Sequence, residues 1–287
     1  MSSWINRLTV SATEPELVSL ANAFAAAPPP EPFGVPEQTP SAEEWAVIDA
    51  VRHAVAAECA EWGSACPVTP PGQIHFLSPE DFDSLFDGHR AINTMRHTYL
   101  RTGLPLHVLV YQAAHELSHG HSYLHLAIGQ FTDDDGCIKL RPATRRHGIS
   151  CFVRHGTEKR RVFLNVNEAV TDILADRAIR RLQRDCGLDP AIVEEAAGTF
   201  AHWPTVYLVG RMFRYLKDDF GGKRSAARNQ LLRDYMTGTN GFLKAMRRRQ
   251  PGSVRRLADL SHLPVPTAIA AAHLGFPDTV ETILTHD

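Results

Sequence analysis

The sequence has few cysteines, no long apolar run and almost no net charge, and each shortage excludes a class of protein. Five cysteines in 287 residues are an odd number without close spacing, which argues against a secreted domain held by disulfides. No apolar stretch approaches the roughly 20 residues that cross a bilayer. The first residues lack the basic region and apolar run of a signal peptide. We therefore expect a cytoplasmic protein without a transmembrane segment.

The formal net charge of −2 predicts no general affinity for nucleic acid. Charge is nevertheless unevenly distributed along the chain. Residues 1–66 carry nine Asp/Glu against two Arg, whereas residues 223–256 carry ten Lys/Arg against one Asp. We interpret the basic stretch as a solvated helical surface, because neither interleaved aromatics nor a known motif accompanies it. A nucleic-acid or acidic partner is the alternative interpretation.

The most informative stretch has the pattern H-E-x-x-H. His115 and His119 are four residues apart, so on a helix they project from one face and can bind a single Zn²⁺. Glu116 lies beside them and can act as general base on a metal-activated water. Pro105 suits the first turn of such a helix and Gly120 suits its C-terminal cap.

A second expected helix supplies carboxylates. Glu168 and Asp172 are four residues apart and share a helix face. A catalytic zinc site with two histidines needs a third protein ligand, and a carboxylate suffices. The site also needs a group that holds a ligand imidazole in the right tautomer. Glu168 and Asp172 fit these two roles, and the alternative is a solvated helix face.

His115-Glu116-x-x-His119, followed by Asn167-Glu168-x-x-x-Asp172, resembles the gluzincin metallopeptidases, the thermolysin-like group. The resemblance covers roughly residues 70–185 and implies one Zn²⁺ per chain, bound by His115, His119 and Glu168. It implies Glu116 as the catalytic base and Asp172 as the residue that orients a histidine ligand. The implied fold is an α+β zincin-like fold, with a small strand-containing upper half and a mostly helical lower half.

The resemblance also implies features outside the motif. The expected strand over residues 94–100 resembles the zincin edge strand on which a peptide substrate lies. Zincin sites usually include a donor that stabilises the oxyanion. Four residues are eligible for this role, and the sequence does not distinguish among them: His202, Tyr207, Tyr215 and Tyr235.

The same stretch allows a metzincin alternative. His125 lies where that family has its third histidine ligand, but Ser122 stands where the family has Gly. That glycine permits the sharp bend which returns the chain to the metal. The nearest equivalent of a Met-turn is at Met236. We favour Glu168 over His125 as the third ligand.

We expect three segments along the chain. Residues 1–40 form a helix, with a capping box at Thr13, and a proline-rich linker that together suggest a regulatory segment able to cover the cleft or dock on the basic stretch. Residues 41–187 form the zincin catalytic core, with a strand over 73–77 and a hairpin over 148–164. Residues 188–287 form a helical subdomain, with helices beginning near Asp189, Thr205, Lys223, Gly241, Gly252 and Pro266.

The sequence therefore predicts a zinc metallopeptidase that hydrolyses a peptide or protein substrate. One alternative is a zincin-like regulatory or binding protein with little turnover. Another is a nucleic-acid-binding protein in which the H-E-x-x-H pattern is incidental. Neither the natural substrate nor the oligomeric state follows from the sequence.

Overall fold

The structure is a computed structural model of the whole chain. It describes residues 5–12, 15–26, 33–34, 37–86, 89–94, 96–132, 136, 138–155, 158–199 and 202–285. The capping box expected at Thr13 and most of the expected linker lie outside these residues. Among the described residues, no helix combines the length and the apolar character needed to cross a membrane.

The fold mixes helices and strands, as expected for an α+β protein. In chain order the elements are β1 (Arg7–Ser11), α1 (Pro15–Ala26), α2 (Ala42–Glu61), η1 (Pro71–Gln73), β2 (Ile74–Leu77), α3 (Pro79–Leu85), β3 (Ala91–Thr94), β4 (His97–Arg101), α4 (Leu106–His121), β5 (Leu124–Thr132), β6 (Ile138–His147), β7 (Ser150–His155), β8 (Glu158–Val162), α5 (Leu164–Cys186), α6 (Pro190–Ala197), α7 (Trp203–Tyr215), η2 (Lys217–Phe220), α8 (Arg224–Thr237), α9 (Gly241–Arg249), α10 (Ser253–Ala258), α11 (Pro264–His273) and α12 (Pro277–Thr285).

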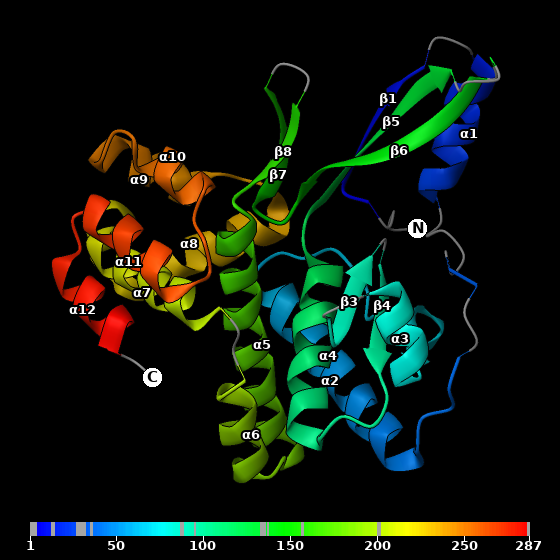
Figure 1. Ribbon diagram of the computed structural model, residues 1–287, viewed down its shortest axis with the longest axis horizontal. Coiled ribbons are helices and arrows are strands. Elements are labelled where there is room, and N and C mark those ends of the chain that lie inside the picture. Colours follow the sequence, from blue (N-terminus) through cyan, green and yellow to red (C-terminus); the bar gives the residue numbers. More distant parts are fainter. Residues whose placement is uncertain are drawn as a thin grey trace.

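Helices α2, α4 and α5 pack against one another in the middle of the molecule (Figure 1). The three-stranded sheet lies on one side of them, and helices α7 to α12 lie on the other. Both long helices α4 and α5 were expected around the two sequence motifs. Helix α4, however, continues to His121, so Gly120 lies inside it and is not its cap. A Cβ at Gly120 would come within 3.2 Å of the Asn93 side chain, so the glycine lets β3 approach the helix closely.

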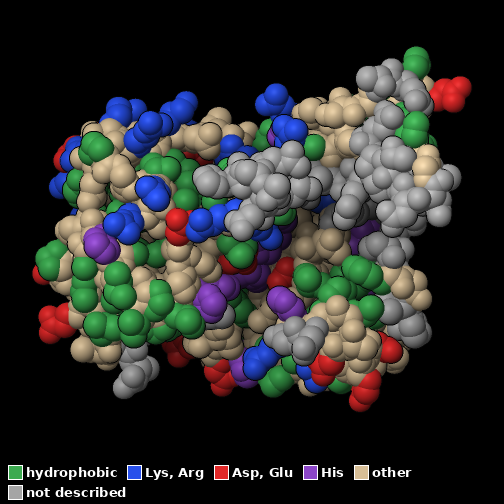
Figure 2. Space-filling view, turned by 45° about the horizontal axis from the view of Figure 1, so that its top comes forward, with side chains coloured by type: hydrophobic (Ala, Val, Ile, Leu, Met, Phe, Trp, Pro, Cys, Tyr) green, Lys and Arg blue, Asp and Glu red, His purple; other side chains and the backbone are tan. Residues whose placement is uncertain are grey.

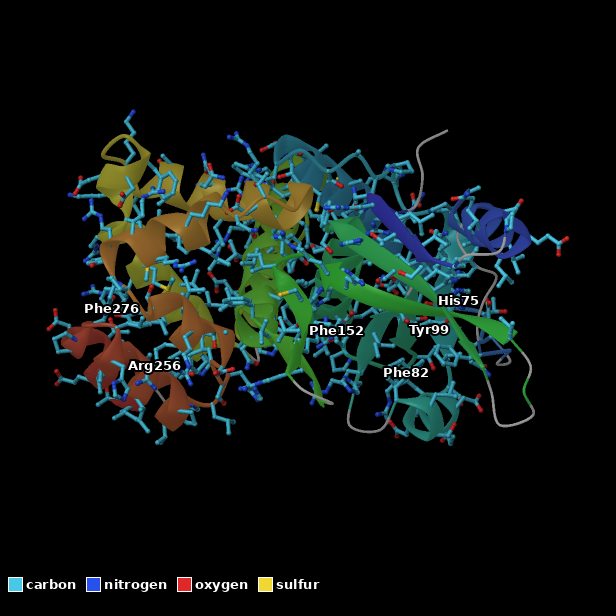
Figure 3. All side chains as sticks on the ribbon, turned by 90° about the horizontal axis from the view of Figure 1, so that it is seen from above. His75, Phe82, Tyr99, Phe152, Arg256 and Phe276 are labelled. Carbon is cyan, nitrogen blue, oxygen red and sulfur yellow. The ribbon has the colours of Figure 1, made fainter. Side chains whose placement is uncertain are left out.

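The smaller sheet has the strand order β2-β4-β3. Strand β2 confirms the strand expected over 73–77, but residues 94–100 are not a single strand. The chain turns at Arg96, where φ is 71°, so that β3 and β4 form an antiparallel hairpin. Strand β3, and not β4, is therefore at the edge of this sheet. Figure 3 shows Tyr99 between His75 and Phe82 on the face that α3 covers.

The larger sheet has the order β1-β5-β6-β7-β8 and contains the hairpin expected before α5. Strand β1 pairs in parallel with β5, with Arg7 opposite His125. A small apolar cluster of its own joins the N-terminal segment to β5, and its N-terminal members are Ile5, Leu8, Val10, Ala21 and Phe24. The described part of the N-terminal segment thus belongs to this sheet and does not lie on the basic stretch, whereas a regulatory role for residues 1–40, including cover of the cleft, stays a prediction. Figure 1 shows β1 and α1 far from α9 and α10.

One large buried cluster extends from Ile48 on α2 to Ile283 on α12. The helices after Gly187 therefore share a core with α2, α4 and α5. All six helix starts expected in this part of the chain lie within two residues of an observed start, and α12 was not expected. Several of these helices have proline at their first or second position. The first N–H groups of a helix have no acceptor within the helix, so the missing N–H of proline costs no helical hydrogen bond there.

Candidate metal centre

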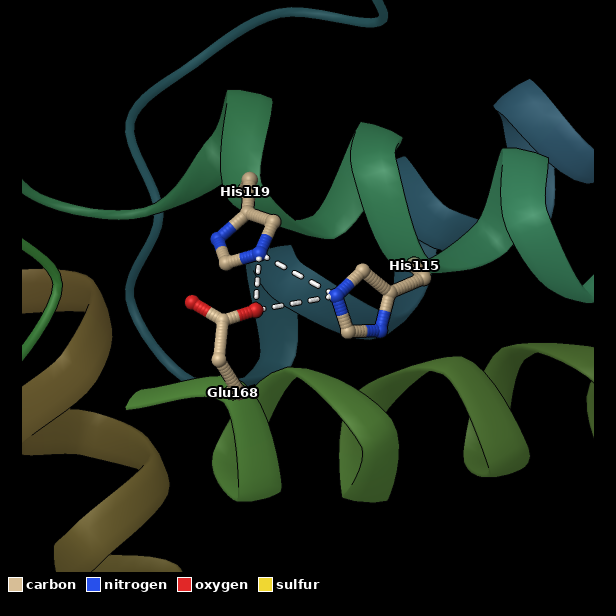
Figure 4. Close-up of side chains that lie close together, drawn as sticks. All are labelled: His115, His119 and Glu168. Atoms are coloured by element: carbon tan, nitrogen blue, oxygen red, sulfur yellow. Dashed lines mark hydrogen bonds and ion pairs between the residues drawn. The ribbon is translucent and has the colours of Figure 1, made fainter. Parts of the chain in front are cut away.

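Helices α4 and α5 bring the three expected ligands to one point (Figure 4). The Nε2 atoms of His115 and His119 are 3.2 Å apart. The Oε2 atom of Glu168 lies 3.2 Å from the first nitrogen and 3.0 Å from the second. These three residues form a group that could hold a metal ion. Two histidines on one helix and a glutamate on its neighbour thus converge as the four-residue spacing predicted.

The distances fit a single tetrahedral ion. Ligand atoms that lie about 2.0–2.1 Å from a tetrahedral Zn²⁺ are separated from one another by roughly 3.3 Å. The side chain of Glu168 is 16 % exposed, so the cluster is not sealed from solvent. Figure 2 shows histidine side chains gathered in a hollow of the surface. The arrangement therefore supplies three ligands and leaves a direction from which a fourth can approach.

The ring nitrogen of His115 that does not face Glu168, Nδ1, is next to a buried carboxylate. This nitrogen lies 2.8 Å from Oδ1 of Asp172, and the hydroxyl of Tyr111 donates to the same oxygen at 2.6 Å. Burial acts to raise the pKa of Asp172, but the hydrogen bonds and charges of His115 and His202 together outweigh it, and the pKa falls to about 2. A permanently ionised Asp172 fixes the proton on Nδ1 of His115, which leaves the Nε2 lone pair for a metal. The orienting role expected for Asp172 thus agrees with its position.

His119 is held from behind by hydroxyl groups. Its Nδ1 is 3.4 Å from the Thr171 hydroxyl and 3.3 Å from the Tyr235 hydroxyl, and the two hydroxyls are 2.8 Å apart. Thr171 donates to the backbone oxygen of Asn167 at 2.9 Å, so its own oxygen can accept from His119. Tyr235 is completely buried, and burial raises its pKa above the ordinary value. Its hydroxyl lies at Nδ1 of His119, whereas Glu168 lies at Nε2 of the same ring.

Asn167 explains how α5 is placed. Its side-chain oxygen accepts the backbone N–H groups of Ile149 at 2.9 Å and Ser150 at 3.3 Å, which ties the β6–β7 turn to the helix. The turn passes close to the site at Gly148, where φ is 58°. A Cβ there would come within 2.4 Å of Asn167 and 2.6 Å of Tyr235. Only glycine allows this approach, so the turn, α5 and Tyr235 position one another.

Glu116 is 9 % exposed and follows His115 directly on α4. The part of the chain that the structure describes gives its carboxylate no hydrogen bond or ion pair. A carboxylate next to a ligand, and free of a structural partner, is available to exchange a proton with a bound water. The structure thus leaves Glu116 available for the role of base.

Of the four eligible donors, two lie at the cluster: Tyr235 at Nδ1 of His119, and His202 beside Asp172 and His115. Nδ1 of His202 is 3.5 Å from Oδ2 of Asp172, and its ring stacks on that of His115 with centroids 6.2 Å apart. Tyr207 bonds to a threonine on α12, and Tyr215 packs against Phe276. No spacing signal in the sequence distinguished His202, because it precedes α7 and approaches α5 only through the packing of these helices.

His125 does not reach the cluster. It lies on β5, and its Nε2 is 2.9 Å from the Thr9 hydroxyl on β1. The metzincin alternative is therefore corrected, because the chain runs on as a strand after α4 and does not bend back to the ligands. His147 was not expected near the site. Its Nε2 donates to the backbone oxygen of His119 at 3.0 Å, and burial lowers its pKa to about 3.

Comparison of the chain with protein-family models, with curated proteins and with solved structures finds no match. The functional assignment therefore depends on the geometry of this cluster.

Proposed function

We propose that the protein is a zinc-dependent metallopeptidase of the gluzincin type, with a zincin-like fold. The observation that carries the proposal is the convergence of His115, His119 and Glu168 on one point, at separations suited to one tetrahedral Zn²⁺. The H-E-x-x-H helix with its neighbouring carboxylate helix, and the ionised Asp172 behind His115, support it. Each of these features is expected of a hydrolytic zinc site and unusual for a structural histidine cluster.

The chemistry divides among a few residues. A bound Zn²⁺ supplies a Lewis acid that acidifies water and polarises a scissile carbonyl. Glu116 takes the proton of the attacking water and delivers it to the leaving amine. His202, beside the cluster, donates a hydrogen bond to the oxygen that develops negative charge. Asp172 and Thr171 keep the two ligand imidazoles in their productive orientation.

Strand β3 is the proposed binding edge for an extended peptide. It is the outer strand of the order β2-β4-β3, and it packs against α4, with Asn93 next to Gly120. A peptide added to this edge would gain main-chain hydrogen bonds and pass close to the H-E-x-x-H helix. The substrate class is therefore an extended segment of a peptide or protein.

Glu116→Gln tests the proposal. The variant should keep one zinc per chain by elemental analysis and lose about 10²–10⁴-fold in cleavage of a quenched peptide library, because a general base is removed. The exposed glutamate Glu281 gives a matched control, and Glu281→Gln should cleave as the unmodified protein does. Full activity in Glu116→Gln would refute the mechanism. Zinc binding without any cleavage would instead identify a zincin-like binding protein.

A further inference from the structure

A second cavity lies away from the metal cluster, among helices α5, α7 and α8. Its volume is about 430 Å³, within the range of roughly 300–1,000 Å³ that is common for small-molecule sites. Figure 1 shows these three helices near one another in the C-terminal half of the molecule. The lining residues come from all three helices: Ile173, Val206, Gly210, Phe213, Arg224, Ser225 and Arg228.

The walls of this cavity are largely apolar. Ile173, Val206 and Phe213 supply aliphatic and aromatic surface. Gly210 lies in the interior of α7, where glycine costs about 1 kcal/mol relative to alanine. A Cβ at Gly210 would lie 3.4 Å from a terminal nitrogen of Arg224, so the guanidinium rests against the bare backbone. The glycine thus makes room for the guanidinium of Arg224 beside α7.

Two of the three polar side chains that line the cavity, those of Arg224 and Arg228, are cationic. Within the described residues, neither Arg224 nor Arg228 has a hydrogen bond or ion pair to a carboxylate. Nε of Arg228 is buried and lacks a hydrogen-bond partner there. Glu58, whose charge acts on Arg228, is already paired with Arg177. Burial, together with the charges of Arg177 and Arg224, lowers the pKa of Arg228.

Helix α8 adds to the positive potential. It begins at Arg224, and its N-cap residue Lys223 provides no side-chain cap. The first backbone N–H groups of a helix lack intrahelical acceptors and favour an anion nearby. Two guanidiniums and an uncapped helix start therefore lie at one cavity, with the hydroxyl of Ser225 beside them.

We propose that this cavity binds a small organic anion, with a carboxylate or phosphate head on Arg224 and Arg228 and an apolar body against Ile173, Val206 and Phe213. Guanidinium groups pair with both kinds of head in a bidentate manner. Ile173 follows Asp172 on α5, and Val206 lies one turn after His202 on α7. A bound anion therefore contacts α5, which carries Asp172, and α7, whose N-cap residue is His202. The site itself needs no metal.

Calorimetric titration of the full-length, metal-free protein tests this inference separately from peptidase activity. The probes are 4-phenylbutyrate, phenyl phosphate and inorganic phosphate, with 4-phenylbutanol as the neutral counterpart. We expect saturable binding of at least one aromatic anion, and at least tenfold weaker binding of the alcohol, because the alcohol forms no charge-assisted hydrogen bonds. The two aromatic anions distinguish a carboxylate from a phosphate ligand. Inorganic phosphate that binds as tightly as both would show that the apolar walls play no part.

Variants locate the site. Arg224→Gln and Arg228→Gln should each weaken binding about tenfold or more, whereas Arg255→Gln, on α10, should leave it unchanged. Gly210→Leu should also block binding, because its side chain would take the space beside α7 and displace the Arg224 guanidinium that rests there. Thermal unfolding confirms that each variant is folded. Absence of saturable binding up to the solubility limit of both aromatic anions, or equal binding by Arg224→Gln and Arg255→Gln, would overturn the proposal.

Discussion

Helix α5 takes part in two clusters, each built on a buried carboxylate but with different partners. On one side Glu58 of α2 is 2 % exposed and accepts hydrogen bonds from Trp62, Arg177 and Arg181. On the other side Asp172 is 0 % exposed and faces His115. The pKa of each carboxyl is lowered, because its partners outweigh the effect of burial.

The partners determine what each cluster can do. Guanidinium groups keep their charge at any physiological pH and offer no lone pair, so Arg177 and Arg181 form a clamp between α2 and α5. An imidazole can lose its second proton and present a lone pair, so His115 can exchange a proton for a metal. Burial alone therefore does not mark a functional site. The chemistry of the groups paired with the carboxylate does.

The largest effect should come from removing the carboxylate that joins the two imidazoles. Structural zinc sites bind with roughly 10–16 kcal/mol shared by about four ligands, so Glu168→Ala should weaken zinc binding on the order of 10²–10³-fold. Competition with a chromophoric chelator measures this affinity. His125→Ala is the matched control and should bind zinc normally, since His125 lies on β5. Equal losses in both variants would contradict the assignment of Glu168.

Removing Glu58 from the arginine clamp should lower the free energy of unfolding and leave zinc affinity unchanged. Glu58→Ala should lower the free energy of unfolding by about 2–3 kcal/mol, less than the 3–5 kcal/mol typical of fully buried pairs. The expected loss of unfolding free energy is smaller because the side chains of Arg177 and Arg181 are 26 % and 21 % exposed, so water can solvate them when Glu58 is removed. Urea unfolding measures the change. Zinc affinity that falls as far as in Glu168→Ala would show that the two clusters are not separable.

Removing the charge behind His115 should have a smaller effect on the metal. Asp172→Asn should weaken zinc binding about 10–100-fold, as is usual for groups that orient a ligand. The amide can accept the His115 N–H but no longer stabilises positive charge on the ring. The chelator assay applies again. A loss as large as that of Glu168→Ala would make Asp172 a ligand instead of a support.

Hydroxyl support should matter less than carboxylate support. Tyr235→Phe removes one of the two hydroxyls near Nδ1 of His119 and leaves Thr171, so zinc affinity should fall less than tenfold, in keeping with a net value of about 0.5–1.5 kcal/mol for a neutral hydrogen bond. Tyr207→Phe, remote from the site, is the control. A larger loss in Tyr235→Phe than in Asp172→Asn would reverse the proposed ranking of the two ligand supports.

The sequence predicted those parts of the site that depend on helical spacing. His115, His119, Glu168 and Asp172 each share a helix face with a partner four residues away, and such periodicity is a local property. Zinc chemistry called for two carboxylate roles, and the resemblance to the gluzincins assigned Glu168 as the ligand and Asp172 as the residue that orients a histidine. The helix starts in the C-terminal part could also be predicted from the sequence, because proline and small residues mark them locally.

The rest depended on contacts between distant residues. The pairing of β1 with β5 joins Arg7 to His125, and no local pattern in either segment specifies the other. Gly120 looked like a helix end, but the close approach of Asn93 on β3 explains it. The hydroxyl support of His119 comes from Tyr235, 116 residues away. These features depend on tertiary packing, which the local sequence pattern of each segment does not specify.

In acid, the unfolding free energies of the unmodified protein and of Glu58→Gln, which lacks the Glu58 charge, should become more alike. The folded-state pKa of Glu58 lies below its ordinary value of 4.5, so its contribution to stability is present above that value and is lost as pH falls through the folded-state pKa. The unfolding free energies of the unmodified protein and Glu58→Gln should therefore differ most at neutral pH and converge in acid. Urea unfolding of both metal-free proteins over this range measures the gap, and because they share the histidine cluster, its titration cancels in the difference. Glu281→Gln should show little gap at any pH. A gap for Glu58→Gln that stays constant into acid would mean that packing, and not charge, joins α2 to α5.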